Sequence, residues 1–465
     1  MKEIIKYVAA LLPAVCMAVF CGCSDQTSNT AEEAVTVYPS VTTTTATTTT
    51  TESTTTTTTT NVYTPPDDPE LVERMEQMTL EEKAAQIVLV CCSDEGAAQK
   101  AAAGGAGGLC LFAQPFANKT AEQVRAMTGG FQSAAKIPLL ISVDEEGGTV
   151  NRVSLNPQLR EVQFWSPHYL FGAGGWEMIR SDTEEKADFL LGLGVNVNLA
   201  PVCDVPQSEA DYIYPRCFSL EPSETAEYIS TVVGIMKKKQ LGCTLKHFPG
   251  YGGSADTHKN MAYDSRAYTA FETGDFLPFS AGITAGADSV MVSHNIVECM
   301  DAAHPASLSQ EVHRILREEL GFRGVIISDD LNMNAITEFT AGQSPAVAAV
   351  LAGNDLLCYS DFEDAVSSVV HAVQLGEITE EQLSDSVLRI LYWKQSLGLF
   401  EQIPVYTTET TTVASETFPS ETVTSAVMTA ASESAFTSET LPVTEPPVVT
   451  GEPGGTVTIW YEFPE

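Results

Sequence analysis

The chain has 465 residues, with 61 acidic and 24 basic side chains and a formal net charge of −37. Nucleic acids and anionic membrane surfaces are bound through basic patches, so this charge balance excludes both as expected partners. Both ends of the chain have a strongly biased composition. The region between them, residues 67–402, is long enough for one large domain with a single core.

The first residues have the pattern of a targeting segment. Lys2 and Lys6 precede an apolar stretch that ends at Phe20, and Cys21-Gly22-Cys23 follow. This resembles a bacterial lipoprotein signal, which implies a signal peptide over residues 1–23 and a lipid anchor on Cys23. Ordinary secretion, or an uncleaved anchor, stays open as an alternative. We therefore expect the protein at the extracellular face of a bacterial cell membrane, held there only through this anchor, or secreted.

Two low-complexity segments flank the central region. Residues 24–66 form a Thr-rich linker, and residues 403–465 form a tail rich in Thr, Ser, Pro and Glu. Such segments bury too little apolar surface to offset the entropy of ordering, so we expect both to be disordered. For the domain between them we expect a monomer.

The cysteines indicate free thiols rather than a disulfide framework. Three of the eleven lie in the signal, and most of the others lie in apolar runs typical of strands. No Cys-x-x-Cys pair is present, so we expect no structural zinc site, and no other metal or cofactor.

The central region alternates between two patterns. Residues 68–82 are expected to be helical, and Thr79 with Glu82 has the spacing of a capping box for a second helix. Eight short apolar runs then alternate with amphipathic stretches, which predicts a parallel sheet buried on both faces. Eight such units over about 330 residues favour an α/β fold, a (β/α)₈ TIM-type barrel. The runs are 87–90, 108–112, 139–143, 195–201, 243–248, 289–294, 325–328 and 355–358, and the last helix is expected at 380–399.

Polar side chains fall where these predicted strands end. Barrel enzymes build their sites from the carboxyl ends of strands, so we expect these side chains to converge on one mouth. They are Asp144 after the third run, Lys246 and His247 at the end of the fifth, His294 at the end of the sixth, and Asp329 and Asp330 after the seventh.

A Gly-rich stretch after Phe248 carries Asp256 and His258. An imidazole titrates near neutral pH, and a carboxylate two residues away can orient it. Together with Asp329, this supplies a nucleophile and a proton-transfer group, the two components of retaining glycoside hydrolysis. Asp330 taken alone is better explained as a helix N-cap.

The turn after the third run pairs Asp144 with Arg152. Carboxylates accept hydrogen bonds from sugar hydroxyls and cations donate to sugar oxygens, so this pair suits carbohydrate binding. An ion pair that braces the turn is the alternative. Arg216, after the fourth run, offers another donor to the same mouth.

Residues 67–402 resemble glycoside hydrolase family 3, in its single-barrel β-N-acetylglucosaminidase branch. The matching motifs are Met78–Lys83 (MTLEEK), Asp144–Gly148 (DEEGG) with Arg152, Asn198–Asp204 (NLAPVCD), Arg216–Phe218 (RCF), Lys246–Gly250 (KHFPG), Asp256–His258 (DTH) and Ser328–Met333 (SDDLNM). Tyr251 departs from the pattern, because it stands where that loop usually has a His.

The resemblance implies roles for single residues. Asp329 would be the nucleophile, and His258 the acid/base assisted by Asp256. The residues that bind the non-reducing sugar would be Asp144, Arg152, Arg216, Lys246 and His247. The implied substrate carries a terminal β-linked N-acetylglucosamine, as in peptidoglycan fragments or chitooligosaccharides.

Three other functions stay open at this point. One is a phosphorylase of the same branch, in which phosphate replaces water. Another is a metal-dependent barrel hydrolase with ligands among His247, Asp256, His258, His294 and Asp329. The third is a surface carbohydrate-binding lipoprotein without catalysis, against which the presence of both Asp329 and the Asp-x-His loop argues.

Overall fold

The computed structural model describes residues 68–254, 261–340 and 342–401. The predicted signal, the Thr-rich linker, the tail, Asp256 and His258 lie outside the described residues. Within them, no helix is both long enough and apolar enough to cross a bilayer.

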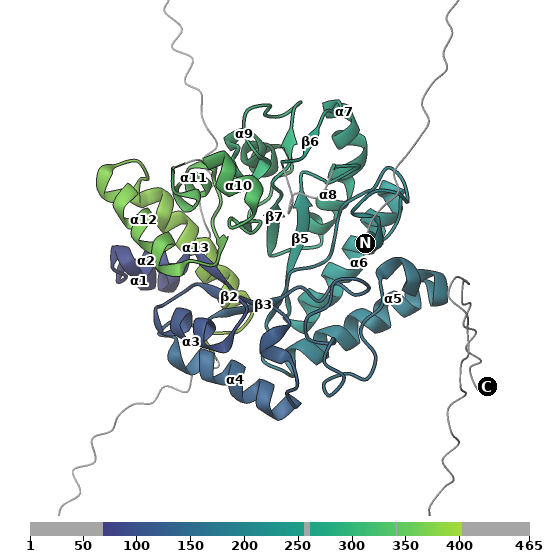
Figure 1. Ribbon diagram of the computed structural model, residues 1–465, viewed down its shortest axis with the longest axis horizontal. Helices are drawn as coiled ribbons and strands as arrows, with labels where there is room; N and C mark the ends of the chain where they lie inside the picture. The colour runs from purple at the N-terminus through teal and green to yellow at the C-terminus, as the bar shows by residue number, and fades with distance from the viewer. Residues whose placement is uncertain (1–67, 255–260, 341, 402–465) are drawn as a thin grey trace, which may run out of the picture. The chain divides into compact units, whose positions relative to one another are not determined.

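Eight parallel strands form a closed barrel, which confirms the predicted fold (Figure 1). The order around the barrel is β10-β1-β2-β3-β4-β5-β7-β9. A bridge between Ile327 and Leu356 joins β9 to the start of β10, so the last pair also carries backbone hydrogen bonds. The strands are β1 Val88–Cys92, β2 Gly108–Leu111, β3 Leu140–Val143, β4 Val197–Asn198, β5 Gly242–Phe248, β7 Ser289–Val292, β9 Val325–Ser328 and β10 Leu357–Tyr359.

Each of these strands falls on one of the eight predicted apolar runs. All their residues are buried, because helices cover the outside of the sheet and side chains fill its inside. The run at 195–201 gives the shortest strand. Its ladder ends after Asn198, and Pro201, which has no N–H to donate, follows three residues later.

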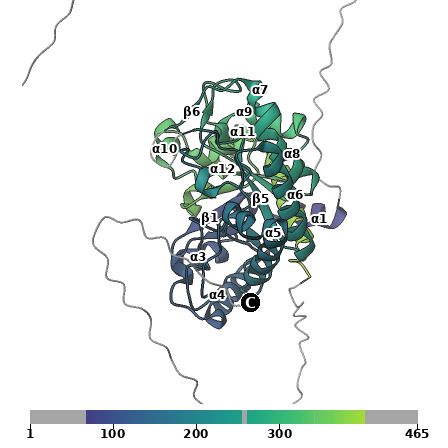
Figure 2. The same ribbon diagram turned by 90° about the vertical axis from the view of Figure 1, so that its right-hand side faces the viewer.

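Helices surround the barrel on its outer side (Figures 1 and 2). Those at the two ends of the domain pack together: α1 contacts α13, and α2 contacts both α12 and α13. The helices are α1 Pro69–Glu76, α2 Leu80–Gln86, α3 Glu95–Ala103, α4 Ala121–Ala134, α5 Pro167–Leu191, α6 Pro222–Lys239, α7 Tyr268–Ala270, α8 Phe276–Thr284, α9 Gln310–Arg314, α10 Asn334–Thr340, α11 Pro345–Ala352, α12 Phe362–Leu375 and α13 Glu380–Ser396.

The start of α2 has the predicted capping box. The Thr79 side chain accepts from the Glu82 backbone N–H, and the Glu82 carboxylate accepts from the Thr79 N–H. The helical stretch predicted over residues 68–82 is interrupted between α1, which ends at Glu76, and α2, the predicted second helix, which begins at Leu80.

A second, two-stranded sheet lies outside the barrel. It pairs β6 Tyr263–Asp264 with β8 Ile296–Val297, which follow β5 and β7 in the chain. Arg266 links it to the helix that follows, since its guanidinium contacts the carboxylates of Asp264 and Asp275, each at 2.7 Å.

The eight cysteines of the described residues are all free, as predicted, and seven of them are buried. Those on the barrel strands include Cys91 on β1, Cys110 on β2 and Cys358 on β10.

Lys394 is an exception in the apolar core. It lies fully buried on α13, and its ammonium donates to the Gln86 side chain at 2.8 Å. Burial disfavours the charged form and lowers the pKa of Lys394 to about 7. In the unfolded chain the group keeps its proton to much higher pH, so between about pH 7 and 10.5 folding releases a proton and becomes more favourable as pH rises.

We therefore expect Lys394→Met to stabilise the domain at pH 7, by roughly 2 kcal/mol after the loss of the Gln86 hydrogen bond. The gain should shrink as pH rises toward 10. Urea unfolding of both proteins over this pH range measures it, with Lys238→Met on the exposed face of α6 as the control. A Lys394→Met variant less stable than the parent throughout would contradict this account.

Candidate active site

Residues at the carboxyl ends of the strands line one cavity of about 560 Å³, which is within the usual size range of small-ligand sites. It contains every described residue to which the family resemblance assigned a catalytic or sugar-binding role. These are Asp144, Arg152, Arg216, Lys246, His247 and Asp329. A smaller cavity behind Glu146 measures about 30 Å³, which leaves room for little more than a water molecule.

The loop after β3 is shaped around Glu145. This fully buried carboxylate accepts the backbone N–H groups of Arg152 at 2.8 Å and Val153 at 2.7 Å. On β4, the Asn198 amide holds the backbone N–H and C=O of Glu145, each at 3.0 Å. Gly147 lies in the same turn with φ of 100°, and a Cβ there would meet the Trp165 carbonyl at 2.1 Å. These contacts fix the loop so that Asp144, Glu146 and Arg152 all face the cavity.

A buried charge cluster joins three strand ends. The Lys246 ammonium, at the end of β5, contacts Asp144 Oδ1 at 2.8 Å and Glu146 Oε1 at 2.6 Å. Arg216, from the turn after β4, grips the Glu146 carboxylate with two hydrogen bonds of 2.9 Å and 2.8 Å. Asp144, Glu146, Lys246 and Arg216 together carry two negative and two positive charges, so the cluster is neutral as a unit.

The pKa values in this cluster follow from burial and pairing. Burial alone would raise the pKa of Glu146, but the Arg216 and Lys246 cations outweigh it and hold the pKa well below its usual range. For Lys246, burial would lower the pKa, but Asp144 and Glu146 raise it above the ordinary value. Glu146 and Lys246 therefore stay charged at neutral pH.

His247 is oriented by Asp204. Its Nδ1 lies 2.7 Å from an Asp204 oxygen, and its Nε2 lies 3.1 Å from Arg216 Nη2. Since the carboxylate can only accept, Nδ1 carries the proton, and Nε2 accepts from the guanidinium. Asp204 also accepts the backbone N–H of Tyr251 at 2.8 Å, and the Tyr251 ring packs edge-on against the imidazole.

Arg152 lies farther from Asp144 than Lys246 does. Its Nη2 is 3.5 Å from Asp144 Oδ2, while its Nη1 donates to the Asn151 carbonyl at 3.2 Å. At this distance the ion pair contributes little to holding the turn. The loop is already fixed by the hydrogen bonds to Glu145. The guanidinium remains on the cavity wall, where it can donate to a ligand.

Asp329 and Asp330 follow β9, and both line the cavity. The Asp330 carboxylate accepts the Asn332 backbone N–H at 2.9 Å and braces a turn. The expectation that Asp330 is a helix N-cap is therefore wrong, because α10 begins only at Asn334.

His294 was expected to point into the mouth, but it has another place. It is fully buried, with Nδ1 against the Ser307 hydroxyl at 2.7 Å and Nε2 against the Asp330 carbonyl at 3.0 Å. It is therefore a positioning residue for the loop that carries Asp329 and Asp330, rather than part of the cavity wall.

Sequence reasoning missed three carboxylates of this site: Glu145, Glu146 and Asp204. The first two lie next to Asp144 in the acid-rich turn, and the last closes the motif at Asn198–Asp204, so all stood in motifs already recognised. What the sequence did not show was which cation each would meet.

Asp256 and His258 lie outside the described residues. The chain before them is anchored near the cavity, since Ser254 N–H donates to the carbonyl of Tyr251, which packs on His247.

The family model for the glycosyl hydrolase family 3 N terminal domain matches residues 79–392. The chain belongs to glycosyl hydrolase family 3. It is therefore an enzyme of the glycoside hydrolase class, and a carbohydrate is its substrate.

Similar proteins agree with this assignment to family 3. A Beta-hexosaminidase from Xanthomonas campestris pv. campestris is 38% identical over 245 residues, which cover 50% of this chain and 70% of the relative. One from Stenotrophomonas maltophilia is 37% identical over 280 residues, covering 57% and 79%. The solved structure of a family 3 beta-N-acetylglucosaminidase from Paenibacillus sp. str. FPU-7 matches with a TM-score of 0.66 and 29% identity, over 73% of this chain and 66% of that chain.

Loss of the Glu146 charge should destabilise the domain, because this carboxylate contacts both Arg216 and Lys246. Glu146→Gln leaves two buried cations short of a counter-charge, and we expect it to lower the free energy of unfolding by about 3 kcal/mol at pH 7. Because the pKa of Glu146 is lowered on folding, this difference should narrow as pH falls below about 4.5.

The matched control is Glu363→Gln, which removes the exposed ion pair with Lys100 and should leave the free energy of unfolding nearly unchanged. Urea unfolding at pH 7 and pH 4 measures both variants. Equal losses of unfolding free energy in the two variants would mean that the buried cluster stabilises the domain no more than a surface ion pair does.

Proposed function

We propose that this family 3 enzyme is a retaining exo-glycosidase that removes terminal β-linked N-acetylglucosamine from oligosaccharides such as peptidoglycan fragments or chitooligosaccharides. The observation that carries the proposal is one cavity in which Asp329 faces five sugar-binding candidates. The names of the two Beta-hexosaminidases and of the Paenibacillus enzyme support the choice of sugar.

The charge cluster has hydrogen-bonding capacity left for a sugar. An ammonium has three protons, and Lys246 uses two contacts on Asp144 and Glu146. Asp144 can accept further hydroxyl donors, since a carboxylate has about four acceptor positions. A pair of neighbouring hydroxyls therefore finds an acceptor in Asp144 and donors in Lys246 and Arg152, which fixes the ring in one orientation.

The reaction then proceeds in two steps. The Asp329 carboxylate attacks the anomeric carbon while His258 gives a proton to the leaving glycosidic oxygen, so the C–O bond breaks and a glycosyl ester forms. In the second step His258 takes a proton from water, and the water oxygen displaces Asp329. The configuration is inverted twice and thus retained. The role of His258, assisted by Asp256, rests on the sequence motif.

The rival metal-dependent mechanism fits the described residues poorly. Both ring nitrogens of His247 are engaged, by Asp204 and Arg216, and those of His294 contact Ser307 and the Asp330 carbonyl. Neither imidazole presents a lone pair to an ion in the cavity.

The second rival is a carbohydrate-binding protein without catalysis. Such a protein would need no carboxylate at the end of β9 beside the sugar-binding residues.

Asp329→Ala should lower hydrolysis of 4-nitrophenyl β-N-acetylglucosaminide by on the order of 10⁴-fold while the thermal unfolding curve stays the same. Added azide should restore turnover with this activated substrate, because it can enter the space of the missing carboxylate. The product expected by NMR is the α-glycosyl azide. Unchanged turnover, or a β-azide, would place the nucleophile elsewhere.

His258→Ala tests the proton donor separately. With a good leaving group such as 2,4-dinitrophenolate the first step needs no proton, so glycosylation should remain close to the parent rate. With the disaccharide chitobiose it should fall by roughly 10³-fold. An equal loss for both substrates would show that His258 has a structural role.

The phosphorylase alternative is decided by the product. Incubation of the parent enzyme with chitobiose, with and without phosphate, should release free N-acetylglucosamine at the same rate in both. Accumulation of N-acetylglucosamine 1-phosphate would instead support the phosphorylase.

A further inference from the structure

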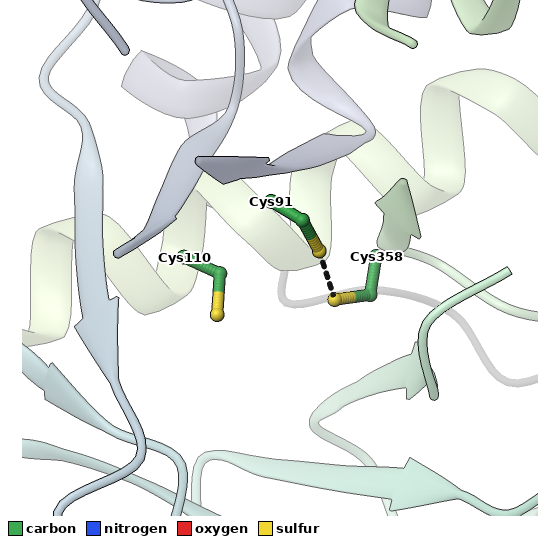
Figure 3. Close-up of side chains that lie close together, drawn as sticks. All are labelled: Cys91, Cys110 and Cys358. Carbon is green, nitrogen blue, oxygen red and sulfur yellow. Dashed lines mark hydrogen bonds between the residues drawn. The ribbon is translucent and has the colours of Figure 1, made fainter. Parts of the chain in front are cut away.

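Three cysteines from neighbouring strands meet at the inner side of the barrel (Figure 3). Cys91 comes from β1, Cys110 from β2 and Cys358 from β10, and their sulfur atoms all lie within 4.8 Å of one another. The Cys91 and Cys358 sulfurs are 3.0 Å apart, and Figure 3 marks this contact with a dashed line.

The cluster belongs to the wall of the 560 Å³ cavity, because all three residues line it. Each is nearly inaccessible, with 7%, 3% and 4% of the surface of Cys91, Cys110 and Cys358 exposed. A small ion that enters through the mouth can reach the sulfurs, whereas a protein partner cannot.

Strand register argues against a disulfide between the two closest thiols. Cys358 pairs with Leu89, so Cys91 lies two residues farther along β1. Two residues of strand and one interstrand spacing separate their Cα atoms by roughly 8 Å, beyond the 4.4–6.8 Å that a disulfide spans. Cys91 pairs directly with Cys110, but its sulfur is turned toward Cys358.

The dimensions suit a metal ion held by sulfur. Three thiolates bound at about 2.3 Å to one ion lie roughly 3.8–4.0 Å apart. The cluster spans 3.0 Å to at most 4.8 Å, so small rotations of the side chains suffice. No fourth His, Cys, Asp or Glu ligand joins the group among the residues that the structure describes. A closed zinc site needs four ligands, whereas Cu(I) is a soft ion that accepts three thiolates.

We propose that Cys91, Cys110 and Cys358 form a site for one thiophilic metal ion, best suited to Cu(I), in the wall of the substrate cavity. Binding releases the thiol protons and forms three metal–sulfur bonds without any change of oxidation state. Because the ion and the sugar share one cavity, its binding lowers the affinity for substrate. The metal site itself does not rest on the proposed function, but the inhibition does.

The test of binding uses the reduced full-length protein under anaerobic conditions, titrated with Cu(I) against the chromogenic chelator bicinchoninate. The parent should withdraw one Cu(I) per chain from the chelator. Cys110→Ser should weaken the affinity for Cu(I) by at least about 100-fold. The double variant that combines Cys91→Ser with Cys358→Ser should weaken it equally. Cys299→Ser, which changes an exposed cysteine away from the cluster, should bind like the parent.

Circular dichroism checks that each variant is folded, and Cys110→Ala replaces Cys110→Ser if the hydroxyl prevents folding. Equal Cu(I) withdrawal by parent and cluster variants, or none by either, overturns the site. A disulfide between Cys91 and Cys358, found by peptide mapping of freshly purified protein, would also overturn the site.

A separate experiment tests the inhibition. One equivalent of Cu(I) should raise the KM for the aryl glycoside in the parent but not in Cys110→Ala. Tight Cu(I) binding with an unchanged KM would overturn the proposed inhibition but not the metal site.

Discussion

The proposed active site depends on one buried cation, the ammonium of Lys246. A charge taken out of water is unfavourable by several kcal/mol unless partners replace its hydration, and here Asp144 and Glu146 do so at 2.8 Å and 2.6 Å. These carboxylates belong to the loop after β3, whereas the lysine ends β5. The electrostatic requirement of a single side chain therefore ties two strand ends together across the mouth.

The remaining site follows from this constraint. Arg216 from the turn after β4 balances the second carboxylate, and it also donates to His247, which Asp204 orients from behind. Each of these polar groups is held by a neighbour, so the proposed binding of a sugar here would need little reorganisation. Asp329 follows β9, which lies two strands away from β5 in the barrel, on a loop that His294 holds through the Asp330 carbonyl.

Local patterns in the sequence predicted the barrel well, because they depend on short-range physics. Continuous apolar runs such as 325–328 became strands with the predicted bounds, and the Thr79–Glu82 spacing became a capping box. Polar residues at strand ends also converged as expected, since parallel strands present their carboxyl ends on one side. The strand at 195–201 proved much shorter, because an apolar run does not show where its ladder stops.

Pairings between distant residues were not predictable from the sequence. Lys246 and Asp144 are 102 positions apart, and nothing in either motif states that one will neutralise the other. The sequence predicted His294 as a residue of the mouth, but its hydrogen bonds to Ser307 and to the Asp330 carbonyl show that it holds the loop after β9 in place. Cys91 and Cys110 lie on the first two strands and Cys358 on the last, and the pairing of β10 with β1 brings Cys358 beside Cys91. A search for short Cys motifs does not find such a cluster.

The proposed mechanism requires a covalent bond between Asp329 and the sugar held by this charge cluster. Mass spectrometry of the parent enzyme after reaction with a slow 5-fluoro N-acetylglucosamine donor, followed by peptide sequencing, tests this requirement most directly. We expect one sugar per chain, attached to Asp329. A label on Asp330 or Asp144, or no label together with an inverted product by NMR, would contradict it.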